Sequence, residues 1–222
     1  ARDLVNEPAA EIYPASLADL AARRYVRKVP EDPVTGSATT WVVIGPPAAS
    51  GLSGVARNLK AHEILEQLLL ARNELPEAER LTHIVVMGMG EPMANLNNLL
   101  DALAIATSPK GLGISSRHVT ISTVGIPSRM LELAESGRKY HLAVSLHAPE
   151  DALRTRLMPT NEKTGISTIL DAAAQFLAKT GRQVTFEYIL LGGINDRAQD
   201  AEQLARLLEG RRAHVNLIPF NP

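Results

Sequence analysis

Cysteine is absent from this chain of 222 residues. The chain can therefore form no disulfide, and its own residues cannot supply thiolates to a zinc or iron–sulfur centre. Aromatic residues make up only 4% of the sequence, so a core of Leu, Ile, Val and Ala is expected. The six histidines are dispersed and show no metal-ligand spacing, so no metal site is predicted from this chain's own residues.

An excess of charge of either sign is also missing. Lys and Arg total 23 and Asp and Glu total 24, which gives a net charge of -1. Nucleic-acid-binding proteins usually carry a basic excess, because phosphate contacts supply much of their affinity. Any contact with RNA must therefore come from a local patch or from a part of the protein outside this sequence. No apolar run of about 18 residues and no signal-peptide pattern is present, so we expect no membrane contact and a cytoplasmic location.

Alternating helical and strand patterns begin near residue 60 and continue towards the C-terminus. Apolar residues at helical spacing predict helices over Lys60–Asn73, Leu96–Ala106, Pro127–Ser136, Glu150–Arg156, Thr164–Lys179 and Arg197–Leu208. Short apolar runs predict buried strands over His83–Gly88, His118–Thr123, His141–Leu146, Gln183–Leu190 and His214–Ile218. These repeats predict an α/β fold with a parallel sheet and crossover helices. Periodicity alone does not separate an open doubly wound sheet from a partial barrel.

The first fifty residues follow a different pattern, interrupted by prolines and with helical spacing only at Leu17–Tyr25. We therefore expect an irregular N-terminal segment of uncertain origin over residues 1–50 and one regular α/β body over residues 51–222. The opening stretch Ala1–Ala9 resembles a segment of leucyl aminopeptidases, although none of that family's metal-binding motifs follows it.

Polar clusters follow several of the predicted strands. They are Gly90–Pro92, Ser122–Thr123, Ser145–His147 and Asn221–Pro222. In a β/α barrel the active site lies at the C-terminal ends of the strands, so these clusters favour a barrel with one shared pocket. Each cluster also has an ordinary interpretation: a glycine turn, a structural histidine, or hydroxyls that cap the next helix. Taken singly, the residues leave both interpretations open.

Several basic residues in the second half of the chain are candidates for phosphate contacts. They are Arg154, Arg156, Lys163, Arg211 and Arg212, and scattered basic residues of this kind more often form a solvated face. No Ser–His–Asp arrangement with diagnostic context, no HExxH and no P-loop lysine motif is present. The sequence therefore points to no hydrolytic or nucleotide-cleaving centre, and no catalytic residue is assigned.

Five motifs occur in order along the chain: VVMGMGEPMANLNNLL, RHVTISTVGIP, LAVSLHAPEDALRTRLMP, FEYILLGGINDRAQDAEQLA and VNLIPFNP. Their order and spacing resemble the RlmN/Cfr family of radical S-adenosylmethionine (SAM) methyltransferases, which methylate C2 or C8 of an adenine in 23S rRNA. The resemblance extends from about Gly51 to Pro222. It implies the partial β/α barrel of radical SAM enzymes.

The resemblance also implies cofactors, partners and site residues. The cofactors are SAM and a 4Fe–4S cluster, and the substrate is 23S rRNA, with tRNA as a second candidate and a monomer as the expected state. Gly90 and Glu91 match the residues that hold the methionine end of SAM. Further SAM contacts match Ser122, Ser145, Leu146, His147 and Asn221.

The chain departs from the family's pattern at the cluster. The family binds its cluster with a CxxxCxxC loop whose last cysteine precedes an A-S-G or A-T-G run, and here Ala48 stands before Ala49–Gly51. The family's methyl-carrying cysteine would follow Pro222, so residues 51–222 are expected to form a C-terminally truncated barrel. We therefore expect an RlmN-like C2 methyltransferase by descent that is inactive in this form. Two alternatives stay open: a non-catalytic SAM- or RNA-binding remnant, and an unrelated α/β hydrolase.

Overall fold

The computed structural model describes residues 57–87 and 90–220. The chain divides into two compact units, and we describe each by itself: the first holds residues up to 90 and 97–114, the second residues 91–96 and 115–220. The segment expected to be irregular, residues 1–50, and the helix predicted at Leu17–Tyr25 lie outside the described residues. The predicted domain boundary after residue 50 therefore stays a prediction.

The first unit contains helix α2 (Ala61–Asn73), strand β1 (Ile84–Val86) and most of helix α3 (Leu96–Ala106). At the start of α2, the Glu63 carboxylate accepts a hydrogen bond from the Lys60 backbone N–H at 2.8 Å and pairs with Arg57. An acidic side chain placed here stabilises the first helical turn. Helix α2 buries Ile64 and Leu68, which lie on one face because they are four residues apart.

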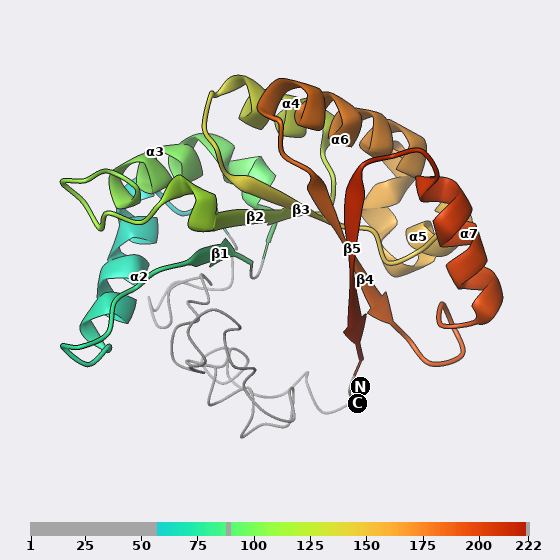
Figure 1. Cartoon of the computed structure of the whole chain (residues 1–222), viewed down its shortest axis with the longest axis horizontal. Coiled ribbons are helices and arrows are strands. Elements are labelled where there is room, and N and C mark those ends of the chain that lie inside the picture. Colours follow the sequence, from blue (N-terminus) through green and yellow to red (C-terminus); the bar gives the residue numbers. More distant parts are fainter. Residues whose placement is uncertain (1–56, 88–89, 221–222) are drawn as a thin grey trace. The chain divides into compact units, whose positions relative to one another are not determined.

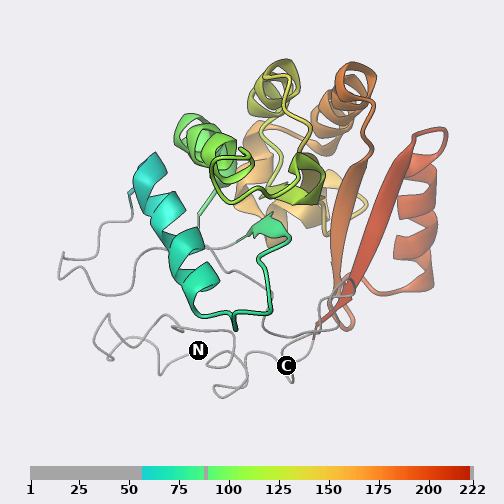
Figure 2. The same cartoon turned by 60° about the vertical axis from the view of Figure 1, so that its left-hand side comes forward.

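The second unit is built on four parallel strands that are neighbours in chain order. Its elements are β2 (Val119–Thr123), α4 (Pro127–Glu135), β3 (His141–Ser145), α5 (Asp151–Leu157), α6 (Ile166–Thr180), β4 (Val184–Leu190), α7 (Ala198–Leu208) and β5 (Ala213–Pro219). Helices connect consecutive strands, as parallel pairing requires. Helices α4 and α6 pack against each other, and Figures 1 and 2 show them with α7 along the same side of these strands.

The two faces of these four strands differ sharply in polarity. Over β2 to β4 one face is mostly apolar and buried, and includes Val119, Ile121, Leu142, Val144, Val184 and Phe186, whereas Val215 and Leu217 on the same face of β5 are exposed. On the other face, the register places Ser122 beside Ala143, and Ser145 beside Glu187, which lies beside Asn216. Parallel sheets covered on both faces usually carry apolar side chains on both. The polar face is therefore the side suited to a polar ligand.

The predicted helices and strands are confirmed over the described residues, with ends that shift by one or two positions. Helix α6 ends at Thr180 and is capped by Gly181, whose φ of 70° is the left-handed conformation expected of a glycine at this position. The sequence patterns missed three short 3₁₀ helices, namely η2 (Pro92–Asn95), η3 (Ser116–His118) and η4 (Pro159–Lys163). Segments of three to five residues are too short to show a hydrophobic period. Among the described helices, none has the length and apolar character needed to cross a membrane.

Candidate cofactor-binding site

Glu91 follows Gly90 directly and its carboxylate is bonded to three groups. It accepts hydrogen bonds from the Met93 N–H at 2.9 Å, the Thr123 hydroxyl at 2.7 Å and the Val124 N–H at 2.7 Å. The first bond caps η2, and the other two attach this segment to the last residue of β2 and to the loop that follows it. Glu91 therefore connects two of the predicted site segments by hydrogen bonds. Its carboxylate can accept roughly four hydrogen bonds, so about one position is left for a ligand.

The C-terminal end of β2 carries two hydroxyl residues with different roles. Thr123 is buried, and its hydroxyl donates to Glu91 and accepts from the Gly125 N–H at 3.0 Å. Ser122 is half-buried on the polar face, and its hydroxyl makes no hydrogen bond with another described residue. Neither residue caps α4, because the N-cap of that helix is Ile126. Thr123 thus shapes the loop, whereas the Ser122 hydroxyl is available to a ligand.

The end of β3 places three predicted site residues in succession. Ser145 is half-buried on the polar face, and its hydroxyl has no hydrogen-bond partner among the described residues. Leu146 is fully buried, and its N–H donates to the Glu187 carbonyl at 3.0 Å while its carbonyl accepts from Arg154 at 3.2 Å. His147 has a φ of 58°, a left-handed conformation that few residues other than glycine adopt. The chain therefore turns sharply where the predicted contacts lie.

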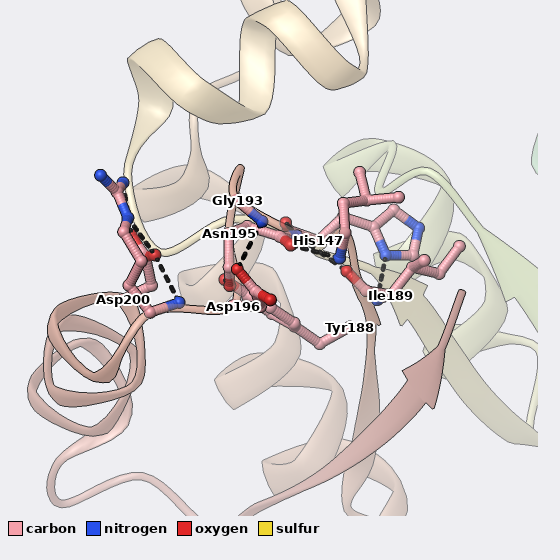
Figure 3. Close-up of polar contacts among 9 residues, drawn as sticks. His147, Tyr188, Ile189, Gly193, Asn195, Asp196 and Asp200 are labelled. Carbon is pink, nitrogen blue, oxygen red and sulfur yellow. Dashed lines mark hydrogen bonds and ion pairs between the residues drawn. The ribbon is translucent and has the colours of Figure 1, made fainter. Parts of the chain in front are cut away.

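The turn at His147 is held by Asn195, a buried residue in the loop after β4 (Figure 3). The Asn195 amide donates to the carbonyls of His147 and Ile189, each at 2.7 Å, and accepts from the Leu191 N–H at 2.6 Å. The carbonyl of Asn195 accepts from the Tyr188 hydroxyl at 2.9 Å. These bonds join the loops after β3 and β4, so the left-handed turn is fixed from the neighbouring strand.

The His147 ring has a defined protonation state. The Ile189 N–H donates to its Nδ1 atom at 3.2 Å, so the proton of the neutral ring lies on Nε2. Burial, together with the nearby charge of Arg154, lowers the pKa of His147 to about 4. At neutral pH the ring is therefore uncharged and offers a hydrogen-bond donor at Nε2, not a base.

Glu187 and Asn216 are polar-face residues that the motifs did not reveal as site residues. Glu187 is only 8% exposed, and the Asn216 amide donates to its Oε2 atom at 2.7 Å. Burial raises the pKa of Glu187, and the hydrogen bond from Asn216 opposes that rise. Their register with Ser145 makes a row of polar side chains across three adjacent strands. The sequence did hold a signal for both residues: each is a polar residue between two apolar residues within a predicted strand.

Arg154 does not contact phosphate as predicted, because its side chain is fully buried. Its guanidinium donates to the carbonyls of Val124, Ser145 and Leu146 and to the side-chain oxygen of Asn161. Burial lowers the pKa of Arg154. The other basic residues in that prediction are exposed: Arg156, Lys163, Arg211 and Arg212.

Two predicted site residues are not placed with the others. Asn221 lies outside the described residues, and Gly90 belongs to the first unit. Gly90 has a φ of 99°, and a Cβ atom there would meet nothing within 4 Å, so the backbone is open to close approach.

Within residues 57–87 and 90–220, no group of three or more His, Cys, Asp or Glu could hold a metal ion. Since the whole sequence also lacks cysteine, the residues present do not fit a 4Fe–4S cluster.

Comparisons with known proteins agree with this arrangement. Residues 49–208 match the family model of the radical SAM superfamily. The chain is 56% identical over 174 residues to a Rhodopirellula baltica protein named probable dual-specificity RNA methyltransferase RlmN. It is 50% identical over 174 residues to a protein of the same name from Symbiobacterium thermophilum. Both matches cover 78% of this chain and 47% of the relative, so the chain spans about half the length of the curated relatives it matches.

A solved structure gives the same result for the fold. The crystal structure of a radical SAM methyltransferase from Sphaerobacter thermophilus matches with a TM-score of 0.73 at 44% identity, over 76% of this chain and 50% of that one. The chain belongs to the radical SAM superfamily, whose members use SAM and a 4Fe–4S cluster. Within that superfamily, the resemblance to RlmN and the α/β fold of a radical SAM methyltransferase are both confirmed.

Proposed function

We propose that this chain is the SAM-binding core of an RlmN-like RNA methyltransferase. One observation carries the proposal: side-chain hydrogen bonds join three predicted site segments at the C-terminal ends of β2 and β3. Glu91 is bonded to the loop after β2 through Val124, and Arg154 joins that loop to Ser145. An unrelated hydrolase is not favoured, because the chain is 56% identical over 174 residues to a protein named as an RlmN methyltransferase.

The SAM contacts proposed within the second unit are hydrogen-bonding groups without protein partners. The hydroxyls of Ser122 and Ser145 and the Nε2–H of His147 make no hydrogen bond with the described residues. A ligand with hydroxyl, amine and carboxylate groups, such as SAM, would satisfy them. When bound, SAM supplies the transferred methyl group and the radical source of this superfamily. Gly90 and Asn221 are proposed as further contacts, and Leu146 as a residue that shapes the pocket.

We do not assign the radical step to this chain alone. Its 222 residues contain no cysteine, and neither Ala48 nor its neighbours provide a thiolate for the cluster. Anaerobic reconstitution with iron and sulfide, followed by visible absorbance, tests this statement. We expect no stable chromophore, and a 4Fe–4S spectrum that survives desalting would contradict it.

RNA is the proposed substrate of the complete enzyme, because the relatives are named RNA methyltransferases. We propose an adenine of 23S rRNA as the target, with tRNA as a second substrate. The chain's net charge of -1 leaves little general attraction for phosphate. Fluorescence anisotropy with a 23S rRNA hairpin should therefore show weak binding with a shallow dependence on salt, and tight binding that falls steeply with salt would contradict this expectation.

Titration of SAM tests the proposed site directly. Without iron to bind the methionine end, we expect a Kd on the order of 0.1–1 mM, measured by ligand-observed NMR. Ser145→Ala should weaken binding about 2–10-fold, which corresponds to one lost hydrogen bond. Ser167→Ala, an exposed serine on α6, is the matched control and should leave the Kd unchanged. Absence of saturable binding at millimolar SAM, or equal effects of the two variants, would refute the site.

A further inference from the structure

Arg154 is a buried cation whose hydrogen bonds all go to neutral oxygens. Its side chain is 0% exposed, and it donates to three backbone carbonyls and to Asn161. Its link to an acidic side chain is indirect, through Asn161, whose amide donates to the Asp151 carboxylate at 2.8 Å. Burying a charge without a direct counter-charge is costly. An apolar residue of similar volume would fill the same space at lower cost, so the guanidinium must contribute something besides packing.

The three carbonyls identify that contribution. Arg154 lies on α5, and its Nη2 atom donates to Val124 at 2.5 Å and to Ser145 at 2.8 Å, while Nε donates to Leu146 at 3.2 Å. These carbonyls lie at the C-terminal ends of β2 and β3, the two strands that carry the proposed serine contacts. A guanidinium is a rigid planar fork, so it fixes the directions of all three acceptors together.

Fixing a carbonyl also fixes the N–H of the next residue, because the peptide group is planar. Arg154 therefore sets the peptide planes that lead into Gly125, Leu146 and His147. The last of these carries the left-handed turn, with φ of 58°. Two loops that are about twenty residues apart in sequence are thereby held in one relative orientation by a single side chain.

We propose that Arg154 is a positioning residue of the SAM site: it locks the peptide groups after β2 and β3 so that the Ser145 and His147 side chains keep the orientation that binds SAM. It makes no contact with the ligand itself. The inference rests on the proposed function, since it takes these loops as the SAM site. A purely structural residue would lower stability but leave the SAM affinity of the folded protein unchanged.

Two variants separate these roles. Arg154→Lys keeps the charge but replaces the fork with one ammonium, which cannot hold three carbonyls in their present directions. Asn161→Ala is the control: it removes a buried neighbour of Arg154 and destabilises the fold, but leaves all three carbonyl bonds in place. Urea unfolding measures the stability of each variant, and SAM titration is carried out where each is fully folded. We expect Arg154→Lys to weaken SAM binding about 3–10-fold, and Asn161→Ala to change it less than about 2-fold.

A second measurement needs no ligand. In ¹H–¹⁵N spectra of the SAM-free protein, the amides of Gly125, Leu146 and His147 should shift in Arg154→Lys, and those of α7 should not. The exposed Arg156→Lys should shift none of them. Wild-type affinity in Arg154→Lys, an equal loss in Asn161→Ala, or unmoved loop amides would each overturn the inference. If the wild-type chain binds no SAM, the proposed function fails, and the amide shifts still decide whether Arg154 fixes the loops.

Discussion

Replacing Asn195 with alanine removes the side chain that joins the loops after β3 and β4. The change deletes two hydrogen bonds of 2.7 Å, to the carbonyls of His147 and Ile189, and one of 2.6 Å from the Leu191 N–H. Asn195 is 1% exposed, so water has little access to the groups left behind. Each bond contributes about 1 kcal/mol, and unsatisfied buried groups add to the loss. We expect the free energy of unfolding to fall by about 3–4 kcal/mol.

Asn195→Asp separates the donor and acceptor roles of the amide. The carboxylate still accepts from Leu191, but it cannot donate and faces the carbonyl oxygens of His147 and Ile189. The loss at pH 7 should therefore be at least as large as that of Asn195→Ala. It should shrink at low pH, where a protonated carboxyl donates one hydrogen bond.

Urea unfolding followed by circular dichroism measures these losses by linear extrapolation. Asn97→Ala, at an exposed position of α3, is the matched control and should change stability by less than about 0.5 kcal/mol. A loss below about 1 kcal/mol for Asn195→Ala would refute the conclusion that this amide fixes the turn at His147.

Two further predictions concern the loops after β2 and β3. Because the pKa of His147 is lowered to about 4 from an ordinary value of 6.5, the unfolded chain binds a proton between these values that the folded chain does not. Stability should therefore rise from pH 4 to pH 6.5, by about 2 kcal/mol after discounting for partial exposure. Urea midpoints across this range measure the rise, and an unchanged slope in His147→Asn would contradict the assignment. Gly125→Ala should cost about 2–3 kcal/mol in the same urea assay, because φ is 94° and a Cβ atom would lie 2.9 Å from the Ile169 Cδ1 atom. Gly137→Ala, at φ 69° with nothing within 4 Å, should cost about 1 kcal/mol, and equal losses would exclude a role for Ile169.

The helices and strands could be predicted because their signals are local. The apolar spacing at Leu96–Ala106 gives the bounds of α3 as the structure has them, and the run at His141–Leu146 gives β3 to within one residue. The C-terminal end of α6 could also be predicted from Gly181, because a glycine adopts the left-handed conformation that ends a helix without help from distant residues. The polar residues at strand ends were recognisable for a related reason, since they interrupt apolar runs at regular places.

The sequence by itself determined the α/β repeat, the polar strand ends and the absence of any thiolate, because each depends on residue type and on spacing within a few positions. Only the tertiary structure decided what the polar side chains do. Arg154 is on a helix whose pattern suggests an exposed cation, yet its partner Val124 lies 30 residues away. Asn195 reaches His147 across 48 residues. Pairings of this kind follow from strand order and register, and no local pattern of residues records which distant carbonyl a buried donor will meet.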